Sequence, residues 1–181
     1  YFPEIYLVRA AAFYRFCYYD RSVAELRELH RRYDPLQREV KQLLNRTKNP
    51  GAFTSLLSDK QLRALNPNLV NYLVRDENFR RAFDLWKQLQ HEKKLLTSGG
   101  KGIPSGWGSE VRSLARSVYS GEKLSFGRLI KATLDRLETQ IDTLLSKADL
   151  VEVEILKAKG KRLRGKEATG KLQARILQLD D

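Results

Sequence analysis

The sequence predicts an all-α fold: a helical hairpin followed by an α-helical bundle with one long heptad-patterned, coiled-coil-like helix. Three observations predict it. Apolar residues recur at three- and four-residue spacing in one segment after another. Helix-start signals, such as Asn-Pro and Asp-Glu pairs, precede several of these segments. One apolar seam keeps its heptad spacing from residue 130 to residue 158.

The composition is that of a folded, soluble chain. It has 181 residues, of which 41% are hydrophobic and 31% charged, with a mean hydropathy of -0.52. This length has room for one core with an appendage. No apolar run approaches the roughly 20 residues of a membrane helix. Because the chain starts at Tyr1 and has no Met, we expect it to begin inside a longer gene product or to have lost its initiator and leader.

The first segment, residues 3–35, is predicted to be two helices that meet around residues 17–20. Its apolar positions are Ile5, Ala10, Phe13 and Phe16, then Val23, Leu26 and Leu29, and after Ile5 they follow helical spacing in each half. Cys17 is the only cysteine, so an internal disulfide and a thiolate metal cluster are excluded. Its apolar neighbours predict a buried cysteine that serves packing.

This hairpin resembles one tetratricopeptide repeat (TPR). The positions that match the repeat pattern are, in order, Tyr6, Ala10, Phe13, the turn Tyr19-Asp20, Ser22, Leu26 and the closing Asp34-Pro35. Three positions depart from the pattern: Arg9 stands at the usual Leu, Leu29 at the second small position of the second helix, and Pro35 one residue late. We therefore interpret the segment as a degenerate or terminal repeat.

The middle region, residues 37–98, is predicted to consist of further helices. Pro35 is placed as a helix start, and Pro50-Gly51 as the stop of that helix. A short helix is expected at 52–57. Asn66-Pro67 and Asp76-Glu77 mark the starts of two more helices, the second being the longer.

A Gly-, Ser- and Pro-rich stretch, residues 97–108, is predicted to be a loop and the best internal boundary. Its glycine spacing fits no phosphate-binding loop, and no strand precedes it. The predicted organisation is a TPR-like hairpin at 1–36, a helical middle region at 37–98, the loop at 99–108 and a helical region at 109–181.

The last region is predicted to hold a helix from Ser109-Glu110 to Ser120-Gly121, and another helix that begins near Ser125. The second carries the seam, which runs through Ile130, Leu134, Leu137, Ile141, Leu144, Ala148, Val151, Ile155 and Ala158. Such a seam predicts coiled-coil packing, either within the chain or in a dimer. The glycines of the basic run 157–171 predict that the helix frays or turns there.

The sequence offers no constellation typical of catalysis. The two histidines, His30 and His91, have charged neighbours on predicted solvent-facing turns, and neither belongs to a metal-binding motif. There is no nucleophile motif and no carboxylate pair framed by apolar residues. We therefore predict no catalytic residue, no cofactor, no metal site and no enzymatic activity.

Two binding surfaces are predicted instead. The aromatic cluster of the hairpin is too wide for one buried stripe, so part of it should face preceding repeats or a partner protein. The candidate partner-binding residues are Tyr6, Arg9, Phe13, Tyr14, Tyr18 and Tyr19. The net charge of +12 favours an anionic partner. The candidate polyanion contacts are Lys157, Lys159, Lys161, Arg162, Arg164 and Lys166. This run lacks the interleaved aromatics that usually stack on single-stranded nucleic acid.

The order of an aromatic repeat ending in Tyr-Asp-Pro, a helical middle and a heptad helix ending in ILKAKGKRLRG resembles the C-terminal portion of large TPR proteins of myxobacteria and predatory relatives. The resemblance implies a non-catalytic protein–protein interaction scaffold in a bacterial envelope assembly. It also implies the periplasm or cell envelope, with the cytoplasm as the alternative. The alternative function is a basic helical protein that binds RNA, DNA or another polyanion through Lys157–Lys171.

Overall fold

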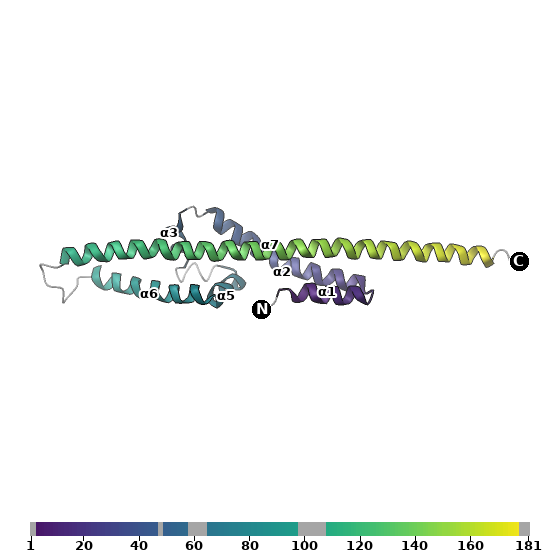
Figure 1. Cartoon of the computed structure of the whole chain (residues 1–181), viewed down its shortest axis with the longest axis horizontal. Helices are drawn as coiled ribbons and strands as arrows, with labels where there is room; N and C mark the ends of the chain where they lie inside the picture. The colour runs from purple at the N-terminus through teal and green to yellow at the C-terminus, as the bar shows by residue number, and fades with distance from the viewer. Residues whose placement is uncertain (1–2, 47–48, 58–64, 98–107, 178–181) are drawn as a thin grey trace. The chain divides into compact units, whose positions relative to one another are not determined.

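The structure of the chain is a computed structural model that describes residues 3–46, 49–57, 65–97 and 108–177. The side chains of 56–57, 97, 166–168 and 170–177 lie outside that description. Every regular element of the described residues is helical, which confirms the all-α prediction (Figure 1). In chain order the elements are α1 (Ile5–Arg15), α2 (Tyr19–Arg46), α3 (Pro50–Phe53), the 3-10 turn η1 (Thr54–Leu57), α5 (Pro67–Arg75), α6 (Glu77–Thr97) and α7 (Gly108–Leu177).

The helices form two compact units. Unit 1 consists of Tyr1–Pro35 and Gln140–Asp181, and unit 2 of Leu36–Thr139. The long helices α2 and α7 contribute residues to both units.

Unit 1 contains the helical hairpin made by α1 and the first part of α2. Ala10 on α1 and Ser22 on α2 are fully buried, and the Ser22 hydroxyl donates a hydrogen bond of 2.6 Å to the Ala10 carbonyl oxygen. Small side chains at both positions let the two backbones approach closely. The buried hydrophobic residues of this unit are Ala10, Val23, Leu26, Leu29, Tyr33, Ile141, Leu144, Leu145, Ala148 and Ile155.

The prediction that Pro35 closes the hairpin and starts a new helix is wrong, because α2 continues through it to Arg46. An internal proline removes one helical hydrogen bond and costs about 3 kcal/mol. The residues on either side, Tyr33 and Leu36, are almost fully buried. Packing of these two side chains offsets that cost, so the helix does not end.

Part of the core of unit 2 is an aromatic cluster between α6 and α7. The Phe79 and Phe126 rings lie 5.9 Å apart, as do those of Trp86 and Phe126, while Trp86 and Tyr119 lie 4.9 Å apart. Such tilted pairs stabilise a core beyond the apolar area that they bury. Burial raises the pKa of Tyr119. This cluster fixes the pairing of α6 with α7 inside unit 2.

Side-chain caps set the helix starts of unit 2. The Asn49 side chain accepts a hydrogen bond of 2.9 Å from Gly51 N, and Pro50 takes the first helical position of α3. Asn66 caps α5 in the same way, with Pro67 at its first position. An Asp76 carboxylate oxygen accepts from Phe79 N at 3.0 Å. The predicted starts at Asn66-Pro67 and Asp76-Glu77 are confirmed, and α3 starts at Pro50, two residues earlier than predicted.

Helix α7 is a single helix of 70 residues. The predicted end at Ser120-Gly121, the new start near Ser125 and the break in the basic run are therefore wrong. A Cβ added at Gly121, Gly160 or Gly165 would meet nothing within 4 Å, so each glycine costs the helix only about 1 kcal/mol. The predicted loop at 99–108 lies outside the described residues, except Gly108.

The heptad seam follows the buried side of α7 in both units. Ile130, Leu134 and Leu137 are buried in unit 2, and Ile141, Leu144, Ala148 and Ile155 are buried in unit 1. Val151 and Ala158 are half-buried. Coiled-coil pairing with another helix stays a prediction.

Candidate interaction surfaces

The turn between α1 and α2 is a helix C-cap with an unusual residue. Cys17 N donates to the Tyr14 carbonyl oxygen at 2.9 Å, and Tyr18 N donates to that of Phe13, also at 2.9 Å. This is a Schellman motif, in which the residue at the Cys17 position adopts a left-handed conformation. The φ of Cys17 is 60°. Glycine usually occupies this position, so no pattern of glycines marked the turn in the sequence.

Apolar side chains of the turn are exposed to solvent. Cys17 is exposed, so the prediction of a buried packing cysteine is wrong. Phe16 is 74% exposed and Tyr18 is 55% exposed. Two aromatic rings therefore flank an accessible thiol at the end of the hairpin.

An apolar face of α1 is also exposed. Ile5 is 52% exposed and Val8 is 66% exposed, and both lie on the same side of the helix as Phe16. The apolar pattern of the first helix includes Ile5, Ala10 and Phe16, but only Ala10 of these three is buried. Spacing alone does not say which of two apolar faces is covered, and here α2 covers the Ala10 side. We call Ile5, Val8, Phe16 and Tyr18 the hairpin outer face.

The six predicted partner-binding residues do not form one surface. Tyr14 and Tyr19 are half-buried, with ring centroids 6.0 Å apart, and the Arg162 guanidinium lies 5.9 Å from the Tyr19 ring. A hydrogen bond with the Cys17 side chain raises the pKa of Tyr19, opposed by the nearby Arg162 charge. Phe13 is half-buried as well. Tyr18 is 55% exposed, beside Arg21, whose guanidinium lies 5.4 Å from its ring, and the Arg9 side chain is 54% exposed.

The other predicted residues of the hairpin, Tyr6 and Arg9, contact the middle of α2. Arg9 makes an ion pair of 2.7 Å with Glu25, and the Arg32 guanidinium lies 5.7 Å from the Tyr6 ring. The structure therefore gives these two residues an internal role. Their charge and ring contacts bind α1 to α2.

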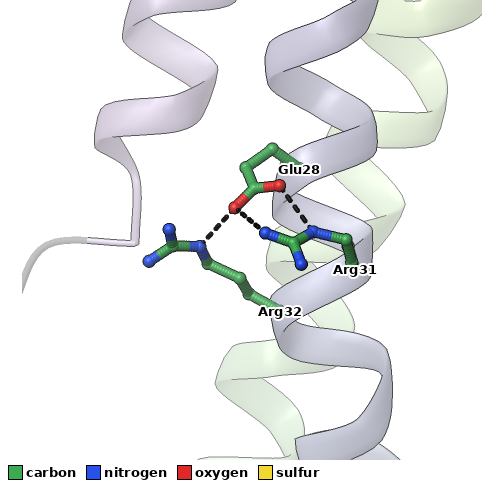
Figure 2. A network of polar contacts seen from close by, with 3 residues as sticks. All are labelled: Glu28, Arg31 and Arg32. Carbon is green, nitrogen blue, oxygen red and sulfur yellow. Dashed lines mark hydrogen bonds and ion pairs between the residues drawn. The ribbon is translucent and has the colours of Figure 1, made fainter.

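A triad of charges on α2 links three side chains, as Figure 2 shows. Arg31 donates two hydrogen bonds of 2.7 Å to the Glu28 carboxylate, and Arg32 donates one of 2.6 Å. These hydrogen bonds, those from Arg31 first, lower the pKa of Glu28 to about 2. Hydrogen bonding to Glu28 also raises the pKa of both arginines. One carboxylate thus offsets half of the local positive charge.

His30 occupies a position that the sequence did not indicate. Its ring is half-buried, with Nδ1 3.2 Å from an Asp34 oxygen on α2 and Nε2 3.2 Å from an Asp149 oxygen on α7. The expectation of a solvent-facing histidine is therefore only partly right, because the ring lies between two carboxylates of unit 1. The sequence did not indicate this arrangement, because Asp149 lies more than a hundred residues after His30 in the chain. His91 is exposed.

The basic run of α7 divides between two sides of the helix. Lys159 pairs with Asp20 of α2, and Arg162 lies over the Tyr19 ring. Lys157, Lys161 and Arg164 are exposed and share another side of the helix. The side chain of Lys166 lies outside the described residues. The six predicted polyanion contacts are thus adjacent in sequence but do not form a single patch.

The last surface was missed by the sequence analysis. Leu150, Val153, Leu156 and Leu163 on α7 are 68%, 48%, 50% and 53% exposed. Leu150 and Val153 lie opposite the buried residues Ala148 and Ile155 of the same helix, while Leu156 and Leu163 lie about a quarter turn from Ile155. A second set of apolar residues at three-and-four spacing beside the seam could have indicated this surface. The more regular pattern of the seam was interpreted in its place.

Comparisons with protein-family models, with curated proteins and with solved structures give no match. The resemblance to a tetratricopeptide repeat therefore stays a prediction. Among the described helices, none is both long and apolar enough to span a membrane. A search of the same residues finds no cluster of three or more His, Cys, Asp or Glu side chains placed to hold a metal ion.

Proposed function

We propose that this chain is a non-catalytic protein–protein interaction scaffold that binds partners through exposed helical surfaces. The observation that carries the proposal is the hairpin outer face, where Ile5, Val8, Phe16 and Tyr18 are each more than half exposed. A contiguous set of large apolar side chains on a surface is typical of an interaction site. Aromatic anchors such as Phe16 and Tyr18 often supply most of the binding energy of an interface.

The TPR resemblance gives this face a specific role. In a repeat array, each hairpin packs its outer face against a neighbouring repeat, since one repeat does not bury its own apolar surface. The close contact of Ala10 with Ser22 supports a tightly packed repeat hairpin. We therefore propose that the hairpin outer face packs against further repeats or against a partner in a bacterial envelope assembly.

The test is a capture experiment with the full chain immobilised and exposed to a lysate of the source organism. Three proteins are compared: the wild type, the double variant Val8→Ser/Phe16→Ser, and the control Leu114→Ser. Leu114 is 68% exposed and lies on α7 in unit 2, so the control removes a similar apolar side chain elsewhere. The proposal expects a discrete protein that the wild type and the control retain and the double variant loses.

Salt separates this proposal from the alternative. Contacts through apolar anchors persist when the salt concentration rises from about 0.1 M to 0.5 M, whereas surface electrostatic contacts are screened. Retention of salt-labile nucleic acid as the main captured species, with equal recovery by all three proteins, would contradict the scaffold.

Polyanion binding is the second candidate, favoured by the shared exposure of Lys157, Lys161 and Arg164. Its test is the salt dependence of binding to a single-stranded DNA oligonucleotide. Neutralising all three residues to Gln should reduce the slope of log K against log salt by about 2, because each contact contributes about 0.7. The matched control neutralises three exposed arginines of unit 2: Arg80, Arg116 and Arg128. Equal slopes for the two triple variants would reject a specific role for the basic run.

A further inference from the structure

Between residues 148 and 164, helix α7 is apolar on two opposite sides. One side contains the buried Ala148 and Ile155. Nearby, Lys159 and Arg162 contact Asp20 and Tyr19 of α2, so α2 covers this side. Val153 is two residues from Ile155, a rotation of about 200° around the helix axis, and it is about half exposed. The second apolar side of α7 therefore lies away from the hairpin.

This second side is hollowed around Gly160. The recess is lined by Val153, Leu156, Lys157, Gly160, Leu163 and Arg164. We call these six residues the α7 recess. Among the described residues, a Cβ placed on Gly160 would meet nothing within 4 Å. The missing side chain thus leaves room at the centre of the recess for an atom group from outside.

The spacing of the lining residues matches the socket of a coiled coil. Val153, Leu156, Lys157 and Gly160 occupy positions i, i+3, i+4 and i+7, which are the four residues that form a hole for one knob side chain. Gly160, Leu163 and Arg164 repeat the first three positions of such a hole one heptad later. The complete hole and the three described residues of the next one, seven residues further on, fit a helix that presents apolar side chains at the same interval.

The charges of the α7 recess select the partner. Its six residues include two cations, Lys157 and Arg164, and no carboxylate. The exposed Lys161 adds a third positive charge at the edge of the recess, one heptad after the exposed Glu154. A second copy of the chain, whose net charge is also +12, would bring the same cations to the same stripe. Carboxylates on either side of the apolar knobs of a partner helix would instead pair with them.

We propose that the α7 recess docks an acidic amphipathic helix of another protein, with apolar knobs in the two holes and carboxylates beside Lys157, Lys161 and Arg164. This inference rests on the proposed interaction role but assigns it a separate surface and a partner chemistry. Because the recess uses one side of a single helix, the contact is small. We expect a Kd on the order of 10 μM for one docked helix.

The probe is a designed, labelled peptide of four heptads, with Leu at the a and d positions and Glu at the e and g positions. A matched peptide carries Lys in place of each Glu. Binding to the full chain is measured by fluorescence anisotropy. The acidic peptide should bind at least about tenfold more tightly than the basic one, since only the acidic one complements the rim of the recess.

Three variants test the position of the site. Leu156→Ser/Leu163→Ser removes two walls of the recess, and Kd for the acidic peptide should rise about tenfold or more. Leu114→Ser/Val118→Ser removes two exposed apolar residues of α7 in unit 2 and should leave Kd unchanged. Gly160→Leu fills the hole while it adds apolar area. Its Kd should rise if the hole receives a knob, and should fall if the surface is merely adhesive.

Other results would overturn the proposal or assign the recess to a different ligand. Equal binding of both peptides, or tighter binding by Gly160→Leu, overturns the proposal. A dimer of the wild type in sedimentation equilibrium that Leu156→Ser/Leu163→Ser abolishes would assign the recess to a second copy. Binding to phosphatidylserine vesicles in place of the acidic peptide would assign it to a membrane. If the acidic peptide does not bind but Val8→Ser/Phe16→Ser still loses the captured protein, only the proposed site at the α7 recess is rejected. The proposed scaffold function is then retained.

Discussion

Gly127 of α7 lies where the backbone of α3 comes closest. A Cβ built on Gly127 would lie 1.9 Å from the Pro50 carbonyl oxygen, 2.5 Å from the Pro50 carbonyl carbon and 3.2 Å from Gly51 N. Real Cβ atoms essentially never approach closer than 3.0 Å. Gly127→Ala therefore requires α3 to withdraw by about 1.1 Å. The obstacle is backbone, which a change of rotamer does not relieve.

Two opposing effects determine how much Gly127→Ala changes the free energy of unfolding. Alanine is a better helix former than glycine by about 1 kcal/mol. Overpacking costs about 1–3 kcal/mol, and the withdrawal also loosens Phe53, which is fully buried next to this contact. Complete exposure of a phenylalanine side chain would cost about a further 2–3 kcal/mol. We expect Gly127→Ala to lower the free energy of unfolding by about 1–3 kcal/mol.

Gly121 on the same helix is the matched control. A Cβ at Gly121 would meet nothing within 4 Å, so Gly121→Ala should raise the free energy of unfolding by about 1 kcal/mol through helix propensity alone. Urea unfolding followed by far-UV circular dichroism measures both variants, provided that the slope with denaturant is unchanged. A Gly127→Ala protein as stable as Gly121→Ala would refute the close approach of α3 to α7.

Three further predictions concern single side chains. Thr133 is fully buried, and its hydroxyl has no hydrogen-bond partner among the described residues, so Thr133→Val should raise the free energy of unfolding by about 1 kcal/mol in urea titrations. Cys17 has a φ of 60°, so Cys17→Gly should raise the melting temperature and Cys17→Val lower it; the opposite order would exclude the left-handed turn. The pKa of Glu28 is about 2, below its ordinary 4.5, so its contribution to stability is present above pH 4.5 and is lost as pH falls toward 2. The difference in unfolding free energy between wild type and Glu28→Gln, measured from pH 6 to pH 2, should therefore shrink with acid.

Local chemistry explains why some helix starts were predictable. Asn66 and Asp76 satisfy backbone N–H groups two or three residues ahead, so the whole signal lies within one turn of sequence. The seam was predictable for a similar reason, because its period repeats over many turns. Features that depend on contacts between nearby residues, or on long repetition, are readable from the sequence.

The predicted helix ends were wrong because the prediction considered the local cost of a proline or glycine in a helix and not the tertiary packing of the residues around it. Pro35 is unfavourable in a helix by about 3 kcal/mol, and Tyr33 and Leu36 near it are almost fully buried. Gly160 costs only about 1 kcal/mol. The turn between the first two helices lies where it was predicted, between Arg15 and Tyr19, although a cysteine holds a backbone conformation that usually marks glycine.

The candidate surfaces were harder to predict than the helices. The basic run is continuous in sequence, but a helix turns by about 100° per residue, so Lys159 and Arg162 contact α2 while Lys157 and Arg164 do not. Likewise, Ile5 and Ala10 fit one apolar pattern, yet only Ala10 is buried. Which side of an amphipathic helix is covered depends on its partner helix, and the partner is known only once the fold is known.

The position of the cations beside the α7 recess determines which experiment separates the two functional proposals. Neutralising Lys157, Lys161 and Arg164 weakens polyanion binding, but it also removes the rim that would pair with an acidic helix. That change alone therefore does not distinguish them. Gly160→Leu leaves every charge in place and closes the central hole, where nothing lies within 4 Å. A polyanion that follows surface charge should bind this variant as it binds the wild type, whereas a helix that inserts a knob should bind it more weakly.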